Sequence, residues 1–127
     1  MKETPDVHLI SSLVVLNDLQ HTLLVRYDPE NEAWWLPGSD LEPFEHPEEA
    51  ATRITRDLGL EPVSLELAKV DSFRGRRGWH VVFHYRVKTD QPTSTDVPAD
   101  WFSLENFPKT VHGRWERDTV TAVLAAS

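Results

Sequence analysis

A short acidic stretch in the first half of the chain carries the residues best suited to chemistry. Between Leu36 and Arg53 the sequence places carboxylates first in a proline-containing loop and then in the segment that follows it. These carboxylates are Asp40, Glu42, Glu45, Glu48 and Glu49. Carboxylate oxygens at this density suit a hard divalent cation, and such a cation in turn suits a diphosphate or a triphosphate. The stretch therefore indicates a site for a phosphate-bearing small molecule.

The charge balance of the whole chain excludes several other ligands. Its 127 residues include 13 Lys and Arg against 21 Asp and Glu, which gives a formal net charge of −8. The field of such a protein repels phosphate, so neither a nucleic acid duplex nor an anionic membrane is expected as a partner. The chain has no cysteine, which excludes disulfides, thiolate catalysis and cysteine-based zinc sites.

Length and composition predict a single globular domain over residues 1–127. Hydrophobic residues make up 39% of the chain and charged residues 27%, so a packed core can form. The longest aliphatic run, Leu13 to Leu16, is too short to cross a bilayer, and the first residues lack the apolar core of a signal peptide. We therefore expect a cytoplasmic protein, and a homodimer is compatible with these features.

Hydrophobic periodicity predicts the elements that must position the acidic stretch. Strands are expected at residues 7–16, 22–27, 63–73, 79–87 and 101–103, and helices at 47–58 and 113–126. The first helix has one apolar stripe, which should be buried: Ala50, Ala51, Ile54 and Leu58. A hairpin loop is expected at 74–78 and a long surface loop at 89–100. This order predicts a mixed α+β domain.

The acidic stretch resembles the signature of the Nudix hydrolase superfamily. The residues that match are Trp35-Leu36-Pro37-Gly38, Glu42, Glu45, Ala50-Ala51, Arg53 and Gly59-Leu60, and later Trp101-Phe102-Ser103-Leu104. The resemblance implies a mixed β-sheet sandwiched between helices, an α/β/α arrangement. It also implies cleavage of a phosphoanhydride in a nucleoside diphosphate-linked substrate, with Mg²⁺ or Mn²⁺ held by glutamates of the first helix.

The chain departs from that signature at the metal-binding positions. Ser39 and Phe44 stand where the family usually has glycine, and the segment after Arg53 is one residue short. An alignment anchored at Arg53 puts Ile54 and Asp57 in place of two glutamates, with the third deleted. An alignment anchored at Gly59 puts Arg53 and Arg56 in place of two glutamates and leaves Asp57 for the third. Both alignments leave one helix carboxylate, so the cation is expected to bind weakly.

On the hydrolase hypothesis, Glu45, Asp57 and Arg53 are the candidate catalytic residues, and Glu42, Glu45 and Asp57 are the candidate metal ligands. The candidate substrate-binding residues are Gly38, Trp34, Phe44 and Arg76. Trp34 and Phe44 can supply a stacking wall for a base. Arg76 belongs to the only basic cluster, which can clamp a phosphate or can simply be a solvated hairpin tip.

Two alternatives stay open at this point. Glu49, Arg53 and Asp57 have the spacing of a salt-bridge ladder along one helix face, which would give them a structural role only. The protein as a whole can instead be a Nudix fold without catalysis, serving as a nucleotide-binding or protein-interaction module. In either case the expected ligand is a nucleotide or another diphosphate-containing small molecule.

Overall fold

The computed structural model describes residues 6–28, 30, 32–90 and 97–126. Its strands, in chain order, are β1 (Val7–Leu16), β2 (Thr22–Val25), β3 (Gly38–Asp40), β4 (Pro62–Gly75), β5 (Gly78–Thr89) and β6 (Ala99–Phe102). Its helices are α1 (Pro47–Asp57) and α2 (Trp115–Ala125). The predicted element order is confirmed, with β3 as an addition. Residues 91–96 of the expected long loop lie outside the described residues.

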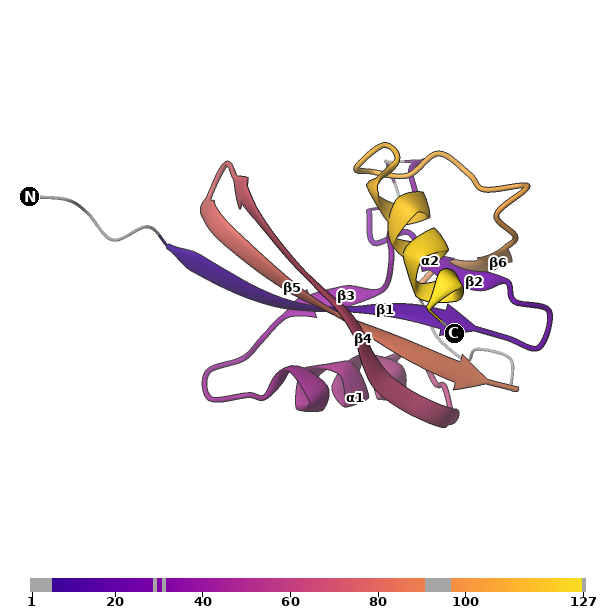
Figure 1. Ribbon diagram of the computed structural model, residues 1–127, viewed down its shortest axis with the longest axis horizontal. Coiled ribbons are helices and arrows are strands. Elements are labelled where there is room, and N and C mark those ends of the chain that lie inside the picture. Colours follow the sequence, from indigo (N-terminus) through magenta and orange to yellow (C-terminus); the bar gives the residue numbers. More distant parts are fainter. Residues whose placement is uncertain (1–5, 29, 31, 91–96, 127) are drawn as a thin grey trace, which may run out of the picture.

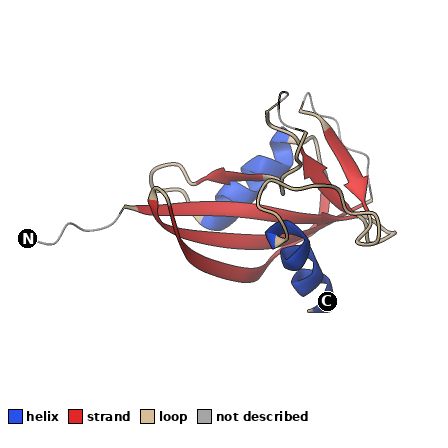
Figure 2. Cartoon of the chain, turned by 90° about the horizontal axis from the view of Figure 1, so that it is seen from above, coloured by secondary structure: helices blue, strands red, loops and turns tan. Residues whose placement is uncertain are grey.

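The strands form one mixed sheet in the order β4-β5-β1-β2-β6, and β3 pairs with β1. β1 and β5 pair in parallel over ten residues, from Val7 opposite Trp79 to Leu16 opposite Lys88. The other pairs are antiparallel. Figure 2 shows the long strands lying side by side along the molecule. The sheet thus gives α1 and the loop before it a rigid base at the middle of β1.

The two helices cover opposite faces of this sheet, as the α/β/α prediction requires (Figure 1). α1 packs on a cluster that includes Leu13, Val15 and Val87, while α2 packs on a cluster that includes Val14, Leu16 and Leu24. Alternate residues of β1 therefore belong to different cores, as the two-residue period of a strand dictates. Neither helix of the described chain has the length and apolar character that a membrane span requires.

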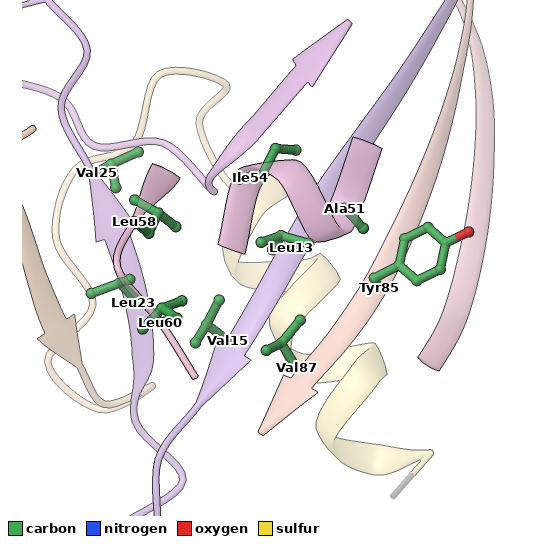
Figure 3. Packing of buried hydrophobic residues seen from close by; sticks show 10 residues of the cluster. All are labelled: Leu13, Val15, Leu23, Val25, Ala51, Ile54, Leu58, Leu60, Tyr85 and Val87. Carbon is green, nitrogen blue, oxygen red and sulfur yellow. The ribbon is translucent and has the colours of Figure 1, made fainter. Parts of the chain in front are cut away.

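The apolar stripe of α1 is buried as predicted. Ala50 and Ala51 are 0% exposed, and Ile54 and Leu58 are 4% and 3% exposed. Figure 3 shows Ala51 and Ile54 directed from the helix towards Leu13 of β1. Pro47 begins the helix, where a missing N–H costs nothing, and Gly59 follows it with a positive φ of 66°.

Candidate functional site

The candidate site begins where β3 runs against β1. A Cβ atom at Gly38 would lie 3.0 Å from the Ser11 carbonyl oxygen, so only glycine fits this close approach without a shift of the backbone. The Tyr27 hydroxyl donates to the Gly38 carbonyl oxygen at 3.3 Å, and the Gly38 N–H donates back to that hydroxyl at 3.1 Å. Desolvation by burial is the main cause that raises the pKa of Tyr27, and the charge of Asp57 acts in the same direction. Gly38, Tyr27 and Asp57 are therefore neighbours.

Arg53 clamps the acidic loop to α1. Its Nε donates to Glu45 Oε2 and its Nη2 donates to Glu45 Oε1, both at 3.0 Å. Nη2 also donates to the Asp40 carbonyl oxygen at 3.2 Å. The Glu42 N–H donates to Glu45 Oε1 at 3.0 Å, which closes the loop on itself. The guanidinium lowers the pKa of the Glu45 carboxyl, mainly through these hydrogen bonds, and that carboxyl raises the pKa of Arg53.

The salt-bridge ladder along α1 does not form. The ion pairs of Arg53 in the described chain are with Glu45 at 3.0 Å and Glu42 at 3.9 Å, and neither Glu49 nor Asp57 comes within ion-pair distance. Glu45 presents both carboxylate oxygens from a fixed loop, so a bidentate pair forms there. Glu49 is exposed and has a long flexible side chain, so it would lose more entropy in reaching the same guanidinium.

Three candidate carboxylates nevertheless gather around one cation. The charges of Glu45, Glu42 and Asp57 all act to raise the pKa of Arg53, after the hydrogen bond from Glu45. Glu42 is exposed, while the side chain of Glu45 is only 10% exposed. The sequence-predicted catalytic residues are thus brought together, with a guanidinium already at their centre.

The helix positions that the resemblance assigns to metal ligands do not fit a divalent cation. In the alignment anchored at Arg53, Ile54 takes the place of the first glutamate, and Ile54 is buried among apolar side chains beside Leu58 (Figure 3). Both oxygens of Glu45 are held by Arg53. Within residues 6–28, 30, 32–90 and 97–126, no group of three or more His, Asp or Glu side chains is arranged to hold a metal ion. The described residues therefore offer no family-like metal site.

An open hollow of about 550 Å³ lies beside the clamp, over the outer face of α1. Its lining mixes both signs of charge, with Arg53 and Arg56 among the cationic groups. The full lining is Glu45, His46, Glu48, Glu49, Thr52, Arg53 and Arg56. Such a surface can bind a polar ligand that carries both anionic and hydrogen-bonding groups.

The candidate substrate-binding residues are only partly brought together. Phe44 is fully exposed in the acidic loop, and its φ of 64° is one that glycine would adopt more easily. Trp34 packs edge-on against Phe102 at 5.0 Å, under the guanidinium of Arg26, among the residues next to the α2 core. Arg76 lies in the β4–β5 turn, which Figure 1 shows well apart from α1 and its loop. Gly38 and Phe44 are thus near the clamp, while Trp34 and Arg76 are not.

Two features of the site region are not evident from the sequence. Tyr27 ends a predicted strand, and no pattern suggests that its hydroxyl holds Gly38. His84 is 0% exposed, and its Nε2 lies 2.8 Å from Asp71 Oδ2 on the α2 side of the sheet. Strand alternation could have shown that His84 faces a covered side, because its neighbours Val82 and Arg86 share that face.

The comparisons with known proteins agree with this architecture. The family model described as NUDIX domain matches residues 7–123. None of the curated protein sequences matches the chain. Similar solved structures include a MutT protein from Methanosarcina mazei Go1, with a TM-score of 0.76 at 16% identity, covering 98% of this chain and 97% of that one.

Two further structures are similar at the same level. One is the NUDIX domain of Shewanella oneidensis NrtR in complex with ADP ribose, with a TM-score of 0.73 at 18% identity, covering 98% of this chain and 89% of that one. The other is a UDP-X diphosphatase, with a TM-score of 0.71 at 18% identity, covering 99% of this chain and 64% of that one. At these identities the likeness shows the fold alone.

Proposed function

The chain belongs to the NUDIX domain family, and from this premise we propose that it binds a nucleoside diphosphate-linked compound at the surface formed by the acidic loop and α1. The burial of Ile54, 4% exposed where the family holds its metal, is the observation that carries the proposal. It favours a binding module over a metal-dependent hydrolase.

Several contacts support ligand binding at this surface. The loop is held in one shape by the bidentate Arg53–Glu45 pair, so it loses little conformational freedom when a ligand binds. Phe44 stands free beside it, and a strained, fully exposed aromatic is suited to stacking on a base. Arg56 lines the hollow with an exposed cationic side chain that can pair with phosphate.

Cleavage of the phosphoanhydride is the second candidate function. The convergence of Glu42, Glu45 and Asp57 on Arg53 favours it, because these are the carboxylates that a weak Mg²⁺- or Mn²⁺-dependent hydrolase would need. A cytoplasmic location, with neither nucleic acid duplexes nor membranes as partners, belongs to both versions of the proposal and rests on the net charge of −8.

One titration separates the two functions. ADP-ribose is titrated into the protein by calorimetry, once with EDTA and once with Mg²⁺, and the mixtures are then assayed for nucleoside monophosphate. The binding module predicts equal affinity in both buffers and no product. Binding that requires Mg²⁺, with product formation that Asp57→Asn abolishes, would establish the hydrolase instead. Asp118→Asn, on the exposed face of α2, is the matched control for loss of one carboxylate. No binding in either buffer refutes the proposal.

A further inference from the structure

An apolar strip on the α1 side of the sheet is left uncovered by the helix. Strand register places Val7 of β1 opposite Trp79 of β5, and Val70 of β4 opposite Phe83 of β5. By the alternation of side chains these residues share the face on which α1 packs further along. The members that are about half exposed, which we call the open strip, are Val7, Leu9, Leu67, Val70 and Trp79.

The open strip is large for a protein that stays alone. Half-exposed side chains of this size add up to an apolar area on the order of 500 Å², which is at the upper end of what monomers expose. A stable interface buries about 800 Å² on each partner, of which roughly 60% is apolar. The strip therefore supplies about the apolar area that one side of such an interface needs.

The charges at the two ends of the strip are opposite. At one end, the β4–β5 turn carries Arg74, Arg76 and Arg77, all exposed, and Arg74 shares the strip face because it pairs with Trp79. At the other end α1 begins, and the charge of Glu48 contributes to raising the pKa of Tyr85, after burial. Glu48 therefore stands close to the strand positions that bound the strip.

A twofold axis through the middle of the strip would match these ends. Val70 lies four residues from Arg74 along β4, about 13 Å at the rise of a strand. Phe83, opposite Val70, lies two residues from Tyr85 on the side of Glu48. In an isologous pair the same patch meets itself in reverse, so each arginine end would meet an acidic end.

We propose that a second copy of this chain covers the open strip, related by a twofold axis near Val70, with the arginine turn of each copy against the first turn of α1 in the other. Resting on the proposed function, this pairing has a further consequence. The partner's turn brings its arginines to the hollow beside Arg53, which explains how Arg76 serves a ligand site that its own chain keeps apart from it.

Sedimentation equilibrium of the full chain, without ligand, tests the pairing from micromolar to millimolar concentration. The wild type is expected to form dimers. Val70→Glu is expected to raise the dimer dissociation constant at least tenfold, because it buries an unpaired charge. Leu19→Glu is the matched control, since Leu19 is a 72% exposed leucine in the β1–β2 turn. A protein that stays monomeric at millimolar concentration, or equal dissociation constants for the two variants, overturns the proposal.

A charge exchange tests the orientation of the two copies. Arg74→Glu and Glu48→Arg should each weaken the dimer several-fold, and the double variant in one chain should recover much of the loss. Additive weakening in the double variant would refute the twofold arrangement. Circular dichroism establishes that each variant is folded. Because no ligand is present, failure of the pairing leaves the ADP-ribose titration unaffected, and failure of that titration leaves the dimer measurement standing.

Discussion

The substitution Ile54→Glu tests most directly whether the inner face of α1 is core or site, because it restores a glutamate that the family signature expects. Ile54 is 4% exposed and packs in the cluster that holds Leu13 and Leu58. A carboxyl introduced there has no cation and no hydrogen-bond partner among those aliphatic neighbours. We therefore expect the substitution to destabilise the domain rather than to create a metal ligand.

The size of this effect depends on pH. A glutamate carboxyl titrates near 4.3 in the unfolded chain, and a fully buried one at about 8–9. Since the folded-state pKa is raised, the penalty is small below about pH 4 and grows as the pH rises towards the folded-state value. Between these two pKa values the electrostatic cost grows by about 1.36 kcal/mol for each pH unit, so it is about 1 kcal/mol at pH 5 and about 5 kcal/mol at pH 8. The latter is comparable to the whole stability of many domains.

Urea denaturation followed by circular dichroism at pH 5 and pH 8 measures this difference. Thr52→Glu is the control, because it adds the same charge to the exposed face of the same helix and should change stability little at either pH. If Ile54→Glu is as stable as the control at pH 8 and gains stability when Mg²⁺ is added, the inner face is a metal site and its assignment to the core is wrong.

Three further predictions concern the clamp, a buried histidine and the exposed aromatic. Arg53→Ala should cost about 1 kcal/mol, since the guanidinium is 26% exposed, and should broaden the NMR signals of loop 42–45, whereas Arg56→Ala should not; sharp loop signals would contradict the clamp. Burial lowers the pKa of His84 below its ordinary 6.5, so the unfolding free energy should fall as the pH drops below that value. His84→Gln should remove that part of the pH dependence in a series of urea titrations, and an unchanged slope would refute the assignment. Phe44→Gly should leave stability within about 1 kcal/mol, because relief of the positive φ offsets the added freedom of the unfolded chain. The same variant should weaken ADP-ribose binding about tenfold in calorimetry, and unchanged affinity would remove Phe44 from the site.

The element order could be predicted because its signals are local. The stripe of α1 and the alternation along β5 are periodicities within a dozen residues, and both are confirmed. β3 could not be predicted because three residues carry no period, and its pairing with β1 depends on the close fit at Gly38. The start and end of α1 follow from Pro47 and Gly59, whose backbone preferences do not depend on tertiary contacts.

The site could be predicted in its membership but not in its connections. Glu42, Glu45 and Asp57 do surround Arg53, yet spacing along the helix suggests Glu49 as the partner of Arg53. The correct partner lies in a loop whose path includes a left-handed residue, and no periodicity describes such a path. The sequence also could not decide between apolar core and metal site at position 54 until the face of α1 was known.

The parallel pairing of β1 and β5 shapes how this chain folds. The paired residues are separated by 72 positions, as Val7 opposite Trp79 illustrates. β1 leaves the ribosome first, and its apolar run at residues 13–16 then has no partner on that edge until β5 has been made. The β4–β5 hairpin is local and can form early, whereas docking β1 beside it must overcome the entropy of closing a long loop. We expect that docking step to limit the folding rate, so the interval before it is when the chain is most exposed to aggregation.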